Sequence, residues 1–100
     1  MCTLEQVTSS LKDNKKVTGY YYQPVVALGV NMNITPIDSY FESKDEAIRE
    51  AYDKIHEGFM LPVGFKAQQA GCIKVKIESI SGYPGGPFEV QIISAVSWQL

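Results

Sequence analysis

The chain has 100 residues, of which 45% are hydrophobic and 20% charged, and its formal net charge is −2. This length and composition predict one folded domain over residues 1–100 and exclude a disordered chain. The small negative charge gives no general attraction to nucleic acid or anionic lipid, and no stretch approaches the ~20 apolar residues that span a bilayer.

The cysteines and the N-terminus bear on localisation. Cys2 and Cys72 lie far apart and share no redox or metal-binding spacing. The first residues have neither the basic start nor the apolar core of a secretion signal. We therefore expect reduced thiols in a cytoplasmic protein without a membrane anchor, with pairing between chains through Cys2 as the alternative.

The first predicted element is a short helix that starts after Thr3. Thr3 and Gln6 have the spacing of a capping box, in which two side chains satisfy free backbone donors at a helix start. Leu4, Val7 and Leu11 follow at the spacing of one helical face. Because so short a helix is marginal alone, we expect it to dock on the rest of the domain.

Residues 17–34 are rich in β-forming residues and are interpreted as two strands, at about 17–23 and 25–34. Pro24, between them, cannot donate to a ladder and marks an edge, a bend or a short hairpin connection. Alternate residues of the second strand are apolar and are predicted to face the core, whereas those between them are small or polar. The apolar set is Val26, Leu28, Val30, Met32 and Ile34.

The clearest predicted element is a helix over residues 43–57. Ser43 and Glu46 form a second capping box, and Gly58 supplies the C-terminal stop. Its opposite face carries acid-first ion pairs and is predicted to be solvated, an acidic docking surface being the alternative. An apolar stripe is predicted to pack on the sheet, formed by Ala47, Ile48, Ala51, Tyr52 and Ile55.

The C-terminal half predicts two further strands. Residues 58–71 are apolar but broken by proline and glycine, so we expect an ordered crossover packed on the core. The doublet Ile92–Ile93 disturbs the later alternation, either as a bulge or because the last strand is buried on both faces. The residues predicted to face inward are Ile73, Val75 and Ile77 in one strand and Phe88, Val90 and Ile92 in the other.

These elements predict an α+β fold with the order α-β-β-α-β-β. The expected architecture is a single four-stranded, mostly antiparallel sheet with both helices packed on one face. The stretch FESKDEAIREAYDKI, residues 41–55, resembles helices in many small α/β proteins, antitoxin-like domains of the HicB type among them. This shared amphipathic pattern implies no function.

Residues that support catalysis or metal binding are sparse. His56 is the single histidine, and no local motif places a serine or cysteine beside it. One histidine and two distant cysteines lack the spacing of a zinc site. The loop GYPGGP, residues 82–87, lacks the lysine and hydroxyl of a phosphate-binding loop and joins two strands. We predict a protein that is not an enzyme and has no metal or cofactor.

The predicted binding surface is the outward face of the sheet with its neighbouring tyrosines. The candidates are Tyr20, Tyr21, Tyr22, Asn31, Asn33, Lys74, Lys76 and Tyr83. Tyrosine offers a large, rigid contact area at small entropic cost, although plain solvation of this face is the alternative. Glu78 and Glu89 share the face, so nucleic acid is not the expected partner. Tyr83 is either a partner contact or a lid on its own sheet edge.

The leading functional hypothesis is a small binding or inhibitory module that recognises another macromolecule, with a protein as the expected partner. A short chain without a catalytic set is typical of accessory proteins of phages and mobile elements. The alternative is a small-ligand-binding protein or minor enzyme with a pocket between the 59–65 crossover and the sheet. The apolar C-terminal end predicts a homodimer with contacts at Trp98 and Leu100.

Overall fold

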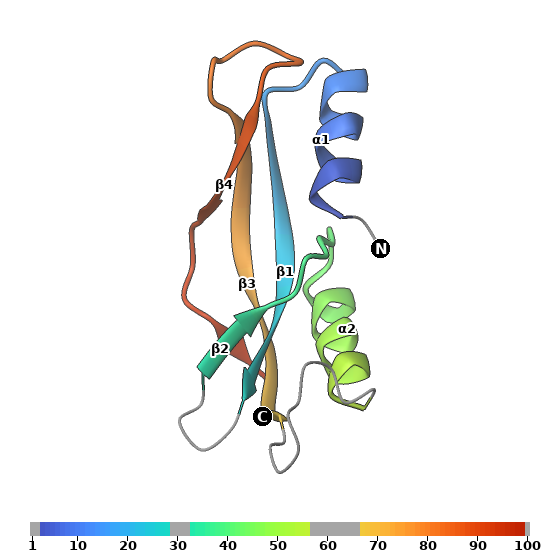
Figure 1. Ribbon diagram of the computed structural model, residues 1–100, viewed down its shortest axis with the longest axis vertical. Coiled ribbons are helices and arrows are strands. Elements are labelled where there is room, and N and C mark those ends of the chain that lie inside the picture. The colour runs from blue at the N-terminus through green and yellow to red at the C-terminus, as the bar shows by residue number, and fades with distance from the viewer. Residues whose placement is uncertain (1–2, 29–32, 57–66, 100) are drawn as a thin grey trace.

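The strands form one antiparallel sheet, and two helices lie beside it (Figure 1). The computed structural model describes residues 3–28, 33–56 and 67–99. The elements are α1 (Leu4–Asp13), β1 (Thr18–Leu28), β2 (Asn33–Pro36), α2 (Lys44–His56), β3 (Ala67–Ser79), β4 (Phe88–Ile92) and β5 (Ser97–Trp98). The strand order is β2-β1-β3-β4, and β5 also pairs with β3. The predicted class and element order are confirmed, with the two-residue strand β5 added.

The long strands β1 and β3 form a twisted ribbon that runs the length of the molecule (Figure 1). They pair from Thr18–Glu78 at one end to Leu28–Ala67 at the other. β2 extends the sheet beside β1 at the second end, and β4 extends it beside β3 at the first. The protein is accordingly elongated, with extents of 46 × 22 × 21 Å.

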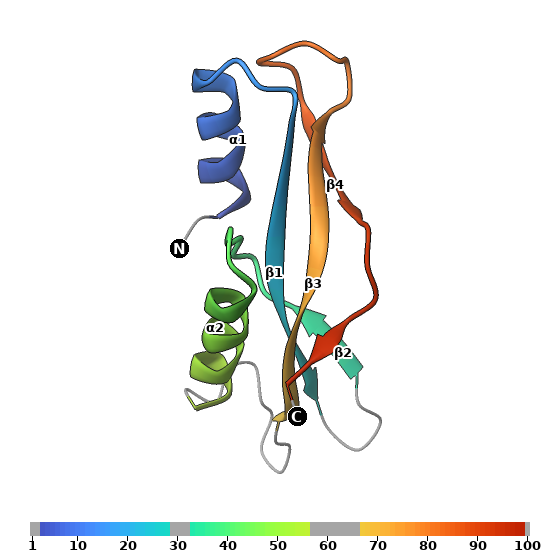
Figure 2. The ribbon, with the colours of Figure 1, turned by 180° about the vertical axis from the view of Figure 1, so that it is seen from behind.

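The two helices lie end to end along the same side of this ribbon (Figures 1 and 2). They nevertheless pack on different residues of β3. Val7 of α1 shares a buried cluster with Val75 and Ile77, whereas Ile48 of α2 clusters with Cys72. Odd- and even-numbered residues of a strand point to opposite faces. The twist of the ribbon therefore turns a different face toward each helix.

Helix α1 forms as its sequence predicts. The Gln6 N–H donates to Thr3 Oγ1 at 3.3 Å, and the Thr3 N–H donates to Gln6 Oε1 at 2.9 Å, which completes the capping box. Val7 and Leu11 are buried, at 2% and 3% exposure. Asn14 ends the helix, where its side-chain amide donates to the Ser10 carbonyl. Tertiary packing of one face thus stabilises a helix that is too short to be stable alone.

Helix α2 buries a narrower stripe than predicted. Ala47, Ile48 and Ala51 are buried, and Ile55 packs at the margin of the core. Tyr52, predicted to be part of the stripe, is 40% exposed, because at 100° per residue it lies on the rim of that face. Of the acid-first ion pairs predicted on the outward side, Glu50–Lys54 is formed, at 3.8 Å.

The predicted division into strands at 17–23 and 25–34 is wrong, because β1 continues through Pro24. The Pro24 carbonyl accepts from the Ile37 N–H at 2.9 Å, on the edge of β1 that faces away from β3. The nitrogen and oxygen of a strand residue point to the same side, so the missing N–H removes no bond to β3. Of the three alternatives for Pro24, the edge position is the one observed.

The regular alternation of residues 26–34 belongs to a hairpin rather than to one strand. Val26 pairs with Thr35, and Ala27 pairs with Ile34. Ile34 therefore lies on the face opposite to Val26 and is 53% exposed, so its predicted burial is wrong. Paired residues lie on the same face of a sheet, and each pair in this hairpin joins an even-numbered residue to an odd-numbered one. The face that carries the even-numbered residues of β1 therefore carries the odd-numbered residues of β2. Val30 and Met32 lie outside the described residues.

Strands β3 and β4 follow their predicted alternation except at one end. Ile73, Val75 and Ile77 are buried, and Phe88 and Val90 pack against the same cluster. The list of inward residues is wrong at Ile92, which is 66% exposed. It is the last residue of β4, so the predicted bulge or two-sided burial does not occur within that strand.

The C-terminal segment closes the core at the far end of the ribbon. Trp98 pairs with Gly71 of β3 and packs against the cluster that contains Val25 and Ile73. A Cβ atom on Gly71 would lie 2.5 Å from the Ser97 carbonyl oxygen, so only glycine permits this close approach. The predicted crossover of residues 58–71 lies largely outside the described residues.

Candidate functional site

One part of the sheet is covered by neither helix. α2 covers the even-numbered face of the ribbon around Tyr22, Val26 and Cys72. Nearer the α1 end the same face carries polar and aromatic side chains, and Tyr20 there is 57% exposed. We call this surface the open face; Tyr22 lies at its margin, where it packs against α2, and its other residues are Tyr20, Lys74, Lys76, Glu78, Glu89 and Gln91.

Lys74 organises the aromatic half of the open face. Tyr22 is directly opposite Lys74 across the β1–β3 pair, and Tyr20 is opposite Lys76. The Lys74 ammonium lies 5.9 Å from the centroid of the Tyr20 ring and 5.8 Å from that of Tyr22. Both distances fall within the range of cation–π attraction, each contact contributing about 0.5–1 kcal/mol at an exposed site. The Lys74 contacts thus favour one arrangement of the two rings in the free protein.

The other half of the open face is a balanced set of charges. Lys76 Nζ lies 3.3 Å from Glu78 Oε2 on the same strand. On β4, Gln91 Nε2 donates to Glu89 Oε1 at 2.6 Å. Two lysines therefore stand beside two glutamates, and the surface has no excess positive charge to attract a phosphate backbone.

The structure brings together four of the predicted site residues, Tyr20, Tyr22, Lys74 and Lys76. Tyr21 is on the opposite face and packs, half-buried, against the cluster under α1. Because successive strand residues alternate, three consecutive tyrosines cannot share one surface. Asn33 is exposed on β2, where it pairs with Leu28 at the opposite end of β1 from Tyr20. Asn31 lies outside the described residues.

The loop between β3 and β4, which contains Tyr83, lies at the α1 end of the molecule (Figure 1). The Tyr83 carbonyl accepts a 2.8 Å hydrogen bond from the Ser79 hydroxyl, while the Tyr83 side chain is 72% exposed. Gly82 and Gly85 adopt φ angles of 78° and 96°, which favour glycine. A ring this exposed does not act as a lid, so the lid interpretation is wrong. The partner-contact interpretation stays a prediction.

The predicted dimer contacts are at the opposite end. Trp98 is half-buried against its own chain rather than presented to solvent. This packing accounts for an apolar C-terminal segment without a second copy. Leu100 lies outside the described residues.

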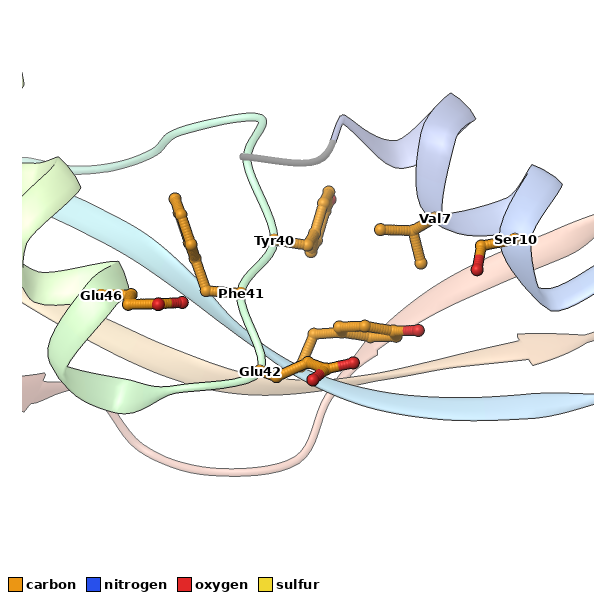
Figure 3. Close-up of a pocket in the computed structure, with 7 residues that line it drawn as sticks. Val7, Ser10, Tyr40, Phe41, Glu42 and Glu46 are labelled. Atoms are coloured by element: carbon orange, nitrogen blue, oxygen red, sulfur yellow. The ribbon is translucent and has the colours of Figure 1, made fainter.

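A cavity that the sequence did not predict lies between α1 and α2 (Figure 3). Its volume is about 230 Å³. Val7 and Ser10 line it from α1, Glu46 from α2, Tyr21 from β1, and Tyr40, Phe41 and Glu42 from the connection before α2. Phe41 is fixed there by paired backbone hydrogen bonds with Tyr22, at 2.7 and 2.9 Å. The only sequence signal is the aromatic pair just before the helix.

The chemistry of this cavity favours contact over catalysis. Burial raises the pKa of the Tyr40 phenol above its ordinary value of 10.0, and the charge of Asp38 raises it further, so the phenol is neutral. Glu46 lies in the first turn of α2, where a carboxylate stabilises the helix N-terminus. The lining contains no histidine, lysine or cysteine. The pocket predicted beside residues 59–65 falls outside the described residues.

The other reactive side chains lie apart from one another. Cys72 is 1% exposed, and burial raises the pKa of its thiol above 9.0 although Lys44 lowers it in part. A thiol with a raised pKa is a poor nucleophile at neutral pH. His56 is exposed at the end of α2. Within residues 3–28, 33–56 and 67–99, no three histidine, cysteine or carboxylate side chains gather closely enough to hold a metal ion.

No family model, curated protein or solved structure matches this chain. In the part of the chain that the structure describes, neither helix has the length and apolar character needed to cross a bilayer.

Proposed function

We propose that this chain is a non-enzymatic module that binds another protein through the open face. The observation that carries the proposal is Tyr20, a large aromatic side chain that is 57% exposed and whose ring centroid lies 5.9 Å from the Lys74 ammonium. Aromatic side chains that are fixed before binding lose little entropy in a complex. They are for this reason common among the residues that contribute most to protein–protein affinity.

The charges of the open face favour a protein over a nucleic acid as the partner. A sheet that stacks bases needs aromatic platforms beside a surplus of cations. Here Lys76 is paired with Glu78, and Glu89 lies across the strand from Glu78. These carboxylates would repel a phosphate backbone, whereas a mixed polar and aromatic surface is typical of the rim and anchors of a protein interface.

Binding rather than turnover is supported by the separation of the reactive groups. His56, the buried Cys72 and the neutral Tyr40 belong to different parts of the fold, and among the described residues the cavity beside Tyr40 is lined by neither of the other two. The proposal includes an inhibitory role, in which the bound partner is an enzyme or an effector. A cytoplasmic accessory protein of a phage or mobile element is the setting that a chain of this kind suggests.

The proposal is tested by capture of the partner from a lysate of the native host with the tagged protein. Tyr20→Ala and Lys74→Ala should each weaken capture at least tenfold and leave the melting temperature almost unchanged. The matched control is Tyr52→Ala, which removes a tyrosine of similar exposure from α2, away from the open face. Equal capture by Tyr20→Ala and by the wild type would contradict the proposal.

The alternative, a small-ligand-binding protein, would use the cavity between the helices. At about 230 Å³ this cavity is smaller than the roughly 300–1,000 Å³ of pockets that hold drug-sized ligands. Mass spectrometry of the protein purified under native conditions distinguishes the two functions. A small molecule that is retained by the wild type and lost in Tyr40→Ala would favour the alternative. Turnover that is abolished by His56→Ala would favour an enzyme.

A further inference from the structure

β4 presents an unpaired backbone edge. On its inner side the Ile93 N–H donates to the Lys74 carbonyl, and the Ile80 N–H donates to the Pro87 carbonyl. Antiparallel bonding alternates, so Glu89 and Gln91 also bond to β3, and the intervening Phe88, Val90 and Ile92 point their N–H and C=O groups outward. Within the described residues no backbone group bonds to these outward groups.

This edge lacks the features that usually protect a free strand. Natural edge strands are commonly blocked by proline, lysine, a bulge or a very short length. The outer edge of β2 ends in Pro36, and β1 is covered from Tyr22 onward by the Phe41 bridge and by β2, which leaves only a short edge at Thr18 and Tyr20. β4 has five residues in regular register with no lysine or proline, and Ile92 beside the edge is 66% exposed.

We propose that β4 pairs with β4 of a second copy of this chain, antiparallel and about a two-fold axis at Val90. This inference goes beyond the proposed function, because it concerns the backbone edge of β4 and a second copy of the chain rather than another protein on the open face. The axis places Val90 opposite Val90 of the partner subunit, and both point their N–H and C=O groups toward each other. Phe88 of one copy and Ile92 of the partner subunit form the next hydrogen-bonded pair. All the outward N–H and C=O groups of the strand therefore have partners in this register.

The side chains of β4 are complementary to their own two-fold copy. Glu89 falls opposite Gln91 of the partner subunit, so a carboxylate meets an amide donor and no like charges are opposed. On the other face Ile92 meets Phe88 of the partner subunit, which covers an isoleucine that is exposed in one copy. A shift that moves the axis to Glu89 would pair Glu89 with Glu89 of the partner subunit, so like-charge repulsion disfavours that register.

The pairing joins the two sheets into one and places the two open faces side by side. Glu89 and Gln91 belong to the open face of each copy, so the joined surface carries two sets of the Tyr20–Lys74 arrangement. A two-fold partner would bind such a surface with higher avidity than one copy provides.

Oligomeric mass is the first test, measured by sedimentation velocity up to about 1 mM, because five paired residues bury less than a standard stable interface. The expected mass rises with concentration from 11.1 kDa toward twice that value. Ile92→Lys should keep the protein monomeric over the same concentration range. The melting temperature of the monomer should equal that of the wild-type monomer. The control is Ile34→Lys, a similarly exposed isoleucine on β2, which should leave association unchanged. A constant mass of 11.1 kDa over this range would overturn the proposal.

Cross-linking tests the register. In a Cys2→Ser background, Glu89→Cys and Gln91→Cys chains are oxidised separately and as a mixture. The pair is of the non-hydrogen-bonded type, whose Cα separation of about 4.5 Å lies within the disulfide range. The mixture should yield a disulfide-linked heterodimer, while each variant alone should yield almost none. No cross-link in the mixture, or equal cross-linking in the separate solutions, would refute the two-fold axis at Val90.

Discussion

Two isoleucines that the sequence assigns to the same core separate sharply in the structure. Ile77 is fully buried beneath α1, whereas Ile92 is 66% exposed at the end of β4. Ile77→Ala removes three carbon groups, a transfer loss of about 2.4 kcal/mol at about 0.8 kcal/mol each. The cavity left among Val75, Val7 and Leu11 adds to this loss, so we expect a total of about 3–4 kcal/mol.

A loss of this size is a large share of the stability of a small domain, which is about 5–15 kcal/mol in total. The melting temperature should fall by about 15–30 °C, since each kcal/mol shifts it by about 4–8 °C at this size. Ile92→Ala is the matched control and should change the free energy of unfolding by no more than about 0.5 kcal/mol.

The assay is urea unfolding followed by the fluorescence of Trp98, the single tryptophan, which packs against the cluster containing Ile77. The protein concentration is kept low, so that any pairing through β4 is dissociated. The slope of the free energy against urea should stay the same in both variants, because neither changes the surface exposed on unfolding by much. Equal destabilisation by the two substitutions would refute the assignment of the buried face.

Three further predictions concern α2, β5 and the buried thiol. Ile48→Asp should place an unpaired charge in the core and lower the free energy of unfolding by about 3–5 kcal/mol, whereas Tyr52→Asp on the rim of the same helix should be nearly neutral. A native thermal melting curve for Ile48→Asp would contradict the packing of α2. Gly71→Ala should displace β5, because the new Cβ would lie 2.5 Å from the backbone oxygen of Ser97. The emission of Trp98 should then shift to the red, and an unchanged spectrum would contradict the pairing of β5 with β3 at Gly71. Burial raises the folded-state pKa of Cys72 above its ordinary 9.0, so the unfolded thiol ionises first. Its contribution to the free energy of unfolding should therefore be complete below pH 9.0 and be lost as pH rises toward the folded pKa, and Cys72→Ala should flatten this decline in urea titrations.

Local patterns in the sequence were sufficient for the elements whose signals lie within a few residues. The Thr3 and Gln6 side chains cap α1 as their spacing predicts, because the capping box is made entirely within one turn. The alternation from Ile73 to Ile77 predicts a strand with one buried face, because side chains of a strand alternate whatever the strand packs against. Four of the candidate site residues share a surface for the same reason.

Tertiary structure decided which face of each element is covered. Periodicity groups Val26 with Ile34, but a hairpin turn between them puts the two side chains on opposite faces. Ile92 continues the pattern of Phe88 and Val90, yet it is exposed because β4 ends there. The cavity beside Tyr40 forms only where the ends of α1 and α2 meet over the twisted ribbon. A sequence pattern indicates which residues share a face, whereas burial of that face depends on which distant elements pack against it. In this protein the twist of the β1–β3 ribbon determines which face each helix covers.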